Sequence, residues 1–277
     1  MASANKDHWS SNTYQASASF VPKLATKVVQ YLDAKPSDKI LDIGCGDGVL
    51  TLDLASSCSS IVGLDFSASM IQTAKDEAAK KNITNATFGI ADCSRLPEDG
   101  KSFVQPGSYD KVFSNAAMHW ILRNPETRDG VFRGAYDALK PGGVFVFECG
   151  GAGNVAETVT AFIASLVHVA GLSVDAAREL IPWYFASEAW ASARLEKAGF
   201  KVEKIELEYR PTKLVEGQGI EGWLRLFGAG ILDSIDESKR DGVINHAVGL
   251  LSGTVTREDG SEYIGYVRLR GIARKPQ

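Results

Sequence analysis

Short apolar segments alternate with amphipathic segments along the first 150 residues of the chain. The apolar segments have the length and flanking turn residues of strands, and the segments between them carry apolar residues at helical spacing. Lys140–Gly143 is predicted as a turn. Strands and helices that alternate in this way predict a parallel, doubly wound α/β sheet. The predicted strands are 40–43, 59–65, 85–92, 109–114 and 144–148, and the predicted helices are 20–32, 49–55, 67–81 and 128–139.

The pattern changes after residue 149. A glycine-rich junction at 150–153 is followed by segments that are mostly helical. We expect one domain, 1–277, in which helical insertions at about 150–198 and 215–255 form a cap over the sheet. The predicted helical segments are 155–169, 174–198 and 220–251, and the last two predicted strands are 201–209 and 265–274.

Three glycines at alternate positions, Gly44, Gly46 and Gly48, follow the first strand. Glycine lets the backbone turn sharply and lets a ligand approach the main chain, which is how α/β proteins hold nucleotide-like ligands. Asp42 lies directly before them, and its carboxylate would repel a pyrophosphate and attract an ammonium or sulfonium group. A helix N-cap is the alternative role for this aspartate. The spacing fails the dinucleotide fingerprint, because no glycine occupies the third position of G-x-G-x-x-G.

The segment Asp42-Ile-Gly44-Cys-Gly46-Asp-Gly48 resembles motif I of the class I methyltransferases that depend on S-adenosylmethionine (SAM). This resemblance implies a Rossmann-like sheet of seven strands with the last strand antiparallel. It also implies that Asp42 orients the methionine end of SAM, while Gly44 and Gly46 let that end lie against the backbone.

Two further predicted strands also end in an acid. Asp65 lies at the interval where an acid accepts hydrogen bonds from ribose hydroxyls, a role that NAD enzymes share. The resemblance places the adenine-reading stretch at Ala91-Asp92-Cys93, and a solvent-facing loop acid is the alternative for Asp92. Acids at three strand ends converge on one edge of a parallel sheet, where α/β ligands bind. The other cofactor candidates are Phe66, which would stack on the adenine, Met70, for which core packing is the alternative, and Asn115.

The family places contacts with the methyl acceptor at the end of the fourth strand, here Asn115-Ala-Ala-Met-His119-Trp120. This stretch lacks the [N/D]-P-P-[Y/F] sequence of enzymes that methylate amino groups of bases or glutamine. It is similar to the branch that contains trans-aconitate methyltransferase. His119 is a candidate for acceptor contact or for a general base, with a core histidine as the alternative. A carboxylate acceptor needs no base near neutral pH, whereas a phenol, alcohol or amine needs one, so both mechanisms stay open.

Selectivity for the acceptor is expected from the cap and from an N-terminal flap, 1–19, for which a loose tail is the alternative. The aromatic rings of the cap would form an apolar pocket or pack in a core. Arg225 and Arg268 are candidates for binding an acidic acceptor, although surface exposure is the default for each. Arg270 shares one face of the last strand with Arg268. The acceptor candidates are Tyr14, His119, Trp120, Trp183, Tyr184, Trp223, Arg225 and Arg268.

The bulk composition limits the partners. The formal net charge is −4, and the lysines and arginines are scattered, so nothing points to nucleic acid. The four cysteines have no C-x-x-C spacing and no Asp/His cluster stands apart from the cofactor acids, so neither a disulfide framework nor a metal site is expected. The N-terminus lacks a signal-peptide core and no apolar run reaches membrane-spanning length. We expect a cytoplasmic monomer or homodimer.

The sequence therefore predicts a SAM-dependent methyltransferase that acts on a small molecule and leaves S-adenosylhomocysteine (SAH). A carboxylic acid is the first expectation for the acceptor, and a metabolite with a hydroxyl or amine is the second. Two other classes stay open. One is a nicotinamide oxidoreductase, disfavoured by Asp42 and by the missing third glycine, and the other is a non-catalytic SAM-binding module.

Overall fold

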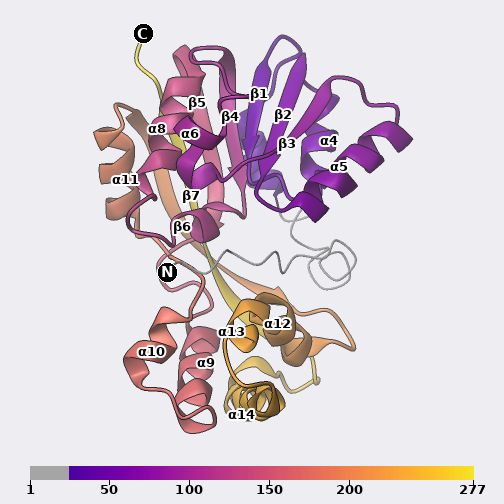
Figure 1. Ribbon diagram of the computed structural model, residues 1–277, viewed down its shortest axis with the longest axis vertical. Helices are drawn as coiled ribbons and strands as arrows, with labels where there is room; N and C mark the ends of the chain where they lie inside the picture. The colour runs from indigo at the N-terminus through magenta and orange to yellow at the C-terminus, as the bar shows by residue number, and fades with distance from the viewer. Residues whose placement is uncertain (1–24) are drawn as a thin grey trace.

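A computed structural model describes residues 25–277 and contains a seven-stranded sheet with the strand order β3-β2-β1-β4-β5-β7-β6 (Figure 1). Strands β1 to β5 run parallel, while β7 lies antiparallel between β5 and β6. The predicted doubly wound sheet with an antiparallel last strand is thus confirmed. The strands are β1 (Lys39–Ile43), β2 (Ser60–Asp65), β3 (Ala86–Ile90), β4 (Tyr109–Asn115), β5 (Leu139–Gly150), β6 (Lys201–Lys213) and β7 (Tyr263–Arg274).

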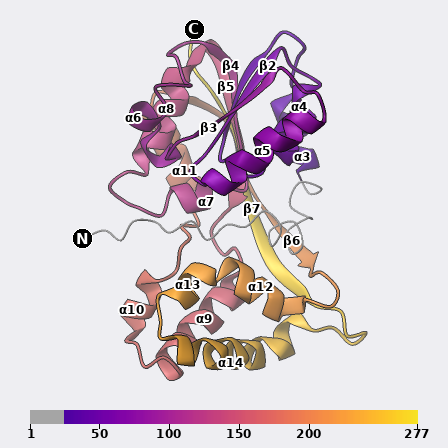
Figure 2. The same ribbon diagram turned by 45° about the vertical axis from the view of Figure 1, so that its right-hand side comes forward.

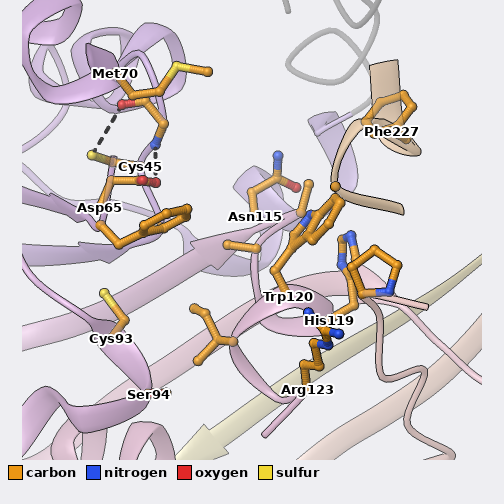
Figure 3. A pocket seen from close by; sticks show the side chains of 18 of the residues that line it. Cys45, Asp65, Met70, Cys93, Ser94, Asn115, His119, Trp120, Arg123 and Phe227 are labelled. Atoms are coloured by element: carbon orange, nitrogen blue, oxygen red, sulfur yellow. Dashed lines mark hydrogen bonds between the residues drawn. The ribbon is translucent and has the colours of Figure 1, made fainter. Parts of the chain in front are cut away.

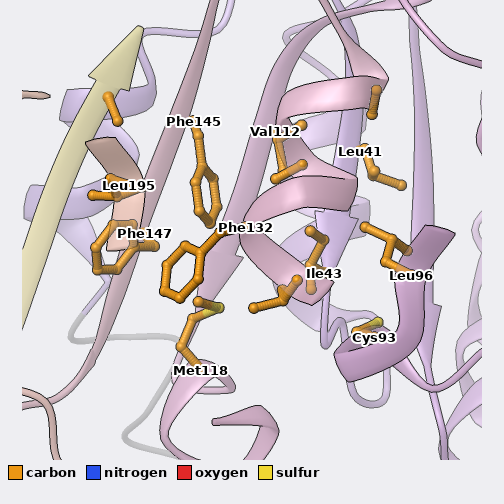
Figure 4. Packing of buried hydrophobic residues seen from close by; sticks show 14 of the residues in the cluster. Leu41, Ile43, Cys93, Leu96, Val112, Met118, Phe132, Phe145, Phe147 and Leu195 are labelled. Atoms are coloured by element: carbon orange, nitrogen blue, oxygen red, sulfur yellow. The ribbon is translucent and has the colours of Figure 1, made fainter. Parts of the chain in front are cut away.

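Alternating residues of the central strands point to opposite faces of the sheet. Ile40 belongs to one core and its neighbour Leu41 to another, because helices cover both faces. Figure 4 shows the second core, in which Phe132 of a covering helix lies with Phe145 and Phe147 of β5. The helices are α3 (Thr26–Leu32), α4 (Val49–Ala55) and α5 (Ala68–Lys80) on one face, and α6 (Leu96–Asp99), α8 (Asp129–Ala138) and α11 (Glu188–Lys197) on the other.

The order of the strands reverses between β1 and β4. Strands β2 and β3 are added on one side of β1, and β4 and β5 on the other. A crevice opens beyond the carboxyl ends of the strands at such a switch point, and ligands of open α/β sheets bind there.

A second layer of helices lies beyond this edge of the sheet (Figures 1 and 2). Strands β6 and β7 extend into that layer, so that Ile264 and Tyr266 of β7 belong to the core of the cap. Helix α11 falls within the expected cap segment 150–198 but packs against the sheet through Ala191 and Leu195. The cap helices are α9 (Ala156–His168), α10 (Val174–Glu179), α12 (Gly219–Phe227), α13 (Ala229–Asp233) and α14 (Glu237–Val255).

One local prediction is wrong. Lys140–Gly143, predicted as a turn, is part of β5. Tyr109 pairs with Leu139 and Lys111 pairs with Val144, so the additional residues of β5 form a bulge between the two pairs.

Two predicted segments at the N-terminus are not covered by the structure. The flap 1–19 and the first part of the helix predicted at 20–32 lie outside the described residues. Within residues 25–277, each helix is too short or too polar to cross a membrane.

Candidate functional site

A cavity of about 1260 Å³ lies between the switch-point edge of the sheet and the cap. Figure 3 shows Asp65 and Met70 on one side of it, Asn115 and His119 on another, and Phe227 contributed by the cap. A pocket for one small ligand measures about 300–1,000 Å³. The cavity therefore has room for a cofactor together with a second molecule.

The loop between β1 and α4 depends on glycine. Gly44, Gly46 and Gly48 have φ of +74°, +56° and +78°, which is the left-handed region that glycine favours. A Cβ on Gly44 would stand 2.2 Å from the Cβ of Ala117, whereas a Cβ on Gly46 would meet no atom of the described chain within 4 Å. The backbone at Gly46 is thus open to the cavity, and a ligand can lie against it.

Asp42 lies in β1, lines the cavity and is 3% exposed. Its Oδ2 accepts a hydrogen bond from Thr51 Oγ1 over 2.6 Å. Burial raises the pKa of Asp42 to about 7, although the Thr51 hydrogen bond opposes this and the Asp65 carboxylate adds to it. The N-cap alternative is excluded, because Gly48 is the N-cap of α4. A buried acid of this kind suits a cationic ligand group, which would compensate its ionised form.

The Asp65 carboxylate connects the ends of β1 and β2. Its Oδ2 accepts a hydrogen bond from the N–H of Gly46 and its Oδ1 from the N–H of Ser67, each over 3.0 Å. Phe66 is 39% exposed and lines the cavity beside it. Met70 lines the cavity and is also packed in the protein, with 3% exposure, so it fits both alternatives.

The end of β3 brings Asp92 and Cys93 to the cavity. Asp92 is the N-cap of the short 3-10 helix η1 (Cys93–Arg95), and its Oδ1 accepts a hydrogen bond from the N–H of Ser94 over 2.9 Å. Ala91 is buried beside them and is not one of the residues that line the cavity.

Asn115 ends β4 and lines the same cavity. Ala116 follows with a φ of +58°, and the chain then turns into the short helix α7 (Met118–Ile121). The side-chain oxygen of Asn115 is buried and has no hydrogen-bond partner among residues 25–277. Buried polar atoms are almost always paired, so this oxygen indicates a ligand.

His119 and Trp120 of α7 also line the cavity. Nδ1 of His119 accepts a hydrogen bond from the N–H of Gly150 over 3.3 Å. Burial, together with the charge of Arg268, lowers the pKa of His119 well below its ordinary value, so the imidazole is neutral at pH 7.

A buried ionic cluster lies where β5, β6 and β7 meet the cavity. Glu148 is 1% exposed and accepts hydrogen bonds from Nε of Arg268, over 3.0 Å, and from Nε of Arg270. A terminal nitrogen of Arg210 lies 3.6 Å from the same carboxylate. Glu148, Arg210 and Arg268 line the cavity, while Arg270 also donates to Glu208 over 2.7 Å. The surface exposure expected by default for Arg268 is wrong, since Arg268 is 5% exposed.

Sequence reasoning missed Glu148 and Arg210. Glu148 ends the predicted strand 144–148, just as the three cofactor acids lie at strand ends. Its position in the sequence could therefore have identified it as a residue of the site. Arg210 lies one residue beyond the predicted strand 201–209. The strand observed, β6, continues to Lys213 and carries Arg210 to the cavity.

The cap aromatics that were candidates for acceptor binding do not line the cavity. Trp223 donates a hydrogen bond from Nε1 to the Tyr266 hydroxyl over 2.7 Å, and its ring lies 6.0 Å from that of Trp183. Tyr184 packs against Trp190, with ring centroids 4.9 Å apart. These rings therefore pack in the protein core, which was the alternative expected for them.

Arg225 is not brought to the cavity either. It forms ion pairs with Glu221 over 2.9 Å and with Asp241 over 3.0 Å. Tyr14 lies outside the described residues. Of the two arginines expected to bind an acid, the structure therefore places only Arg268 at the cavity.

The residues at this edge fit SAM as a ligand. Asp42 suits the cationic methionine end, and the open backbone at Gly46 leaves room for it. Each oxygen of Asp65 accepts a backbone N–H, and because a carboxylate oxygen can accept more than one hydrogen bond, Asp65 also suits a ribose hydroxyl. The oxygen of Asn115 is available to a donor on the ligand.

Comparisons with known proteins agree with this geometry. A family model described as a methyltransferase domain matches residues 34–169. The structure of YcgJ from Bacillus subtilis resembles this one with a TM-score of 0.61 at 16% identity, over 94% of this chain and 99% of that chain. Phosphoethanolamine N-methyltransferase 2 of Haemonchus contortus, crystallised with phosphomonomethylethanolamine and SAH, gives a TM-score of 0.56 at 20% identity, over 92% of this chain and 53% of that chain.

One curated relative matches almost end to end. The uncharacterized methyltransferase C70.08c of Schizosaccharomyces pombe is 38% identical over 270 residues, which cover 98% of this chain and 99% of the relative. A likeness of this extent shows the family. The protein therefore belongs to the methyltransferases, with the Rossmann-like fold of that family.

Proposed function

We propose that this methyltransferase uses SAM to methylate a carboxylate of a small acid, as in the trans-aconitate branch that its Asn115–Trp120 stretch resembles. The observation that supports the proposal most is the ionic cluster at the acceptor end of the cavity. Two guanidinium groups, from Arg210 and Arg268, line the cavity with one carboxylate, Glu148, beside them. Arg268 bonds Glu148 through Nε alone among residues 25–277, so its guanidinium group suits an anionic acceptor.

Residues at the ends of β1, β2 and β3 would hold the cofactor. Asp42 and Gly46 would hold the methionine end, Asp65 would accept from the ribose hydroxyls, and Phe66 and Asp92 would contact the adenine. When bound, SAM supplies a methyl group on a sulfonium, and transfer to a carboxylate oxygen breaks the methyl–sulfur bond and leaves its electron pair on the sulfur of SAH. A carboxylate is already ionised near neutral pH, so the protein needs only to align the acceptor and exclude water.

Arg268 is the residue best placed to hold the acceptor. Among residues 25–277 it hydrogen-bonds through Nε alone, to Glu148. Its terminal nitrogens, Nη1 and Nη2, are thus left for a carboxylate at the cavity. Glu148 and Arg270 fix the position of this side chain, because the carboxylate of Glu148 accepts from both arginines.

Methylation of an amine on an acceptor that also carries an anionic group is the second candidate. The Haemonchus contortus neighbour was crystallised with such a compound, phosphomonomethylethanolamine. Arg268 would bind the anionic group of that acceptor as well as it binds a carboxylate. A non-catalytic SAM-binding module is the candidate of another class.

Labelling separates these candidates. The protein is incubated with methyl-labelled SAM and a fractionated metabolite extract, and each labelled product is then treated with mild base. Release of the label as volatile methanol identifies a methyl ester and supports the proposal. Label that survives base identifies an ether or an amine and contradicts it, and no labelled product favours the binding module.

Arg268→Gln tests the acceptor site directly. This change removes the charge and keeps a donor for Glu148, so we expect KM for the acid to rise about 10- to 100-fold while SAH affinity stays the same. Arg274→Gln is the matched control, because Arg274 is a half-exposed arginine of the same strand and pairs with Glu203 away from the cavity. An unchanged KM for the acid in Arg268→Gln would remove the arginine from the acceptor site.

A further inference from the structure

The Nδ1 atom of His119 faces a group that can only donate a hydrogen bond. The backbone N–H of Gly150 donates to Nδ1 over 3.3 Å, and an N–H can only donate. Nδ1 must therefore carry a lone pair, and the proton of the neutral imidazole lies on Nε2. The side chain lines the cavity, and among residues 25–277 the ring makes its hydrogen bond through Nδ1 and none through Nε2. His119 thus offers a donor to the cavity.

Two aromatic rings pack near the imidazole of His119. Its centroid lies 5.6 Å from that of Trp120 and 5.9 Å from that of Phe185. The carbonyl oxygen of His119 accepts a hydrogen bond from the N–H of Tyr184 over 2.8 Å. A Cβ on Gly150 would stand 2.7 Å from Cε1 of Phe185, so glycine at this position lets the two rings and the strand end pack together.

Gly150 interacts with both His119 and Arg268. Gly150 pairs with Arg268 in the antiparallel register of β5 and β7, while its N–H holds the imidazole. One residue of β5 thereby positions a neutral donor and a cation at the same end of the cavity.

We propose that His119 binds an oxygen of the acceptor carboxylate through a fixed Nε2–H donor, next to Arg268, and that it is not a general base. The inference rests on the proposed acid acceptor. A donor and a cation together select an acceptor that is already anionic. They offer no lone pair to remove a proton from an alcohol or an ammonium group, so they disfavour the hydroxyl and amine acceptors.

The tautomer is measurable without cofactor or acceptor. Long-range proton–nitrogen NMR of the ¹⁵N-labelled protein distinguishes the two neutral tautomers, and the signals lost in His119→Gln assign this ring. We expect the Nε2–H form between pH 6 and 8. The Nδ1–H form, or an imidazolium at pH 7, overturns the proposal, whatever the enzyme methylates.

Substitutions test the role in turnover with the acid found by labelling. The glutamine amide can place an N–H where Nε2–H stands, whereas the shorter asparagine cannot. We expect His119→Gln to keep kcat/KM within about fivefold of the wild type, and His119→Asn and His119→Ala to lose about 10- to 100-fold. His168→Gln, an exposed histidine of the cap, is the matched control.

A base would behave differently. His119→Gln would then be as impaired as His119→Ala, and the wild-type kcat/KM would fall at acid pH with a limb that both variants lack. Those two results together contradict the proposal. A product stable to base, combined with the Nε2–H tautomer, contradicts the acid acceptor but leaves the donor assignment of His119 in place, so the two failures are distinguishable.

Discussion

The carboxylate of Asp65 accepts a hydrogen bond from the N–H of Gly46 over 3.0 Å, which ties the end of β2 to the glycine loop that follows β1. The other carboxylate oxygen accepts from the N–H of Ser67, the N-cap of α5. One side chain thus sets the shape of the cofactor loop and presents charge to the cavity. Its removal should affect binding more than folding, because both hydrogen bonds lie at the edge of the cavity.

Asp65→Ala is expected to weaken SAH binding by about 1–3 kcal/mol, because the ribose hydroxyls lose a charged acceptor. Isothermal titration calorimetry measures the change, and Asp76→Ala on the exposed face of α5 is the control. Unchanged affinity would place the ribose elsewhere.

SAH should also raise the melting temperature of the wild type, while NADH should not. Protection by NADH would favour the oxidoreductase alternative.

The glycine loop provides a matched pair of substitutions. In Gly44→Ala the new Cβ meets that of Ala117 at 2.2 Å and the backbone is left-handed, so the free energy of unfolding should fall by about 2–5 kcal/mol. In Gly46→Ala the Cβ enters open space, and only the backbone strain of about 1–2 kcal/mol remains.

The two variants should therefore differ in what they lose. We expect Gly44→Ala to lose stability first and Gly46→Ala to lose SAH affinity first, since its Cβ occupies the space of the ligand. Urea unfolding and calorimetry on each variant check this. Equal losses of stability would show that the loop near Gly44 relaxes around the added methyl group.

The parts of the fold that sequence predicted are those set by local pattern. Short apolar runs identify β1, at 40–43, and the second half of β5, at 144–147, because helices cover both faces of the sheet. Ser67 caps α5 as its side-chain chemistry suggests, accepting a hydrogen bond from the N–H of Met70. The segment Lys140–Gly143 was wrongly predicted as a turn. Pro-Gly-Gly is typical of turns, but a bulge within a strand uses the same backbone conformations.

Glu148 is expected to be the acid on which the stability of the cavity wall depends most. It is buried between Arg268 and Arg270, so Glu148→Ala leaves buried guanidinium charge without its partner and should cost about 3–5 kcal/mol. Glu203→Ala removes the carboxylate of a half-exposed pair with Arg274 and should cost about 1 kcal/mol or less. Urea unfolding measures both, and similar costs would argue against a dominant role for burial.

The candidate site was predictable at the cofactor end and less so at the acceptor end. Acids at the ends of β1, β2 and β3 are visible in the sequence, because parallel strands bring their carboxyl ends together. The cluster of Glu148, Arg210 and Arg268 depends instead on the register of β5, β7 and β6, which pairs residues far apart in the chain. The sequence also could not decide whether the rings of Trp183 and Trp223 line a pocket or pack in a core, because an apolar pocket and an apolar core need the same residue types.

Asp42 should make stability depend on pH. Its pKa is about 7 in the folded protein against an ordinary value of 3.8, so between these values the folded state holds a proton that the unfolded state has released. Stability then falls as pH rises from about 4 to about 7, by up to about 4 kcal/mol at 1.36 kcal/mol per pH unit. Asp42→Asn keeps an acceptor for Thr51 and should remove this fall, as urea unfolding across the pH range would show.

The same ionisation should govern cofactor binding with the opposite sign. The ammonium group that SAH keeps would favour the ionised Asp42, so the affinity of the wild type for SAH should rise as pH increases from 6 to 8, and binding should release a proton. Calorimetry in two buffers with different ionisation enthalpies measures that proton. In Asp42→Asn the affinity should be lower and nearly independent of pH over this range. Parallel pH profiles for the two proteins would show that the ligand cation does not lie at Asp42.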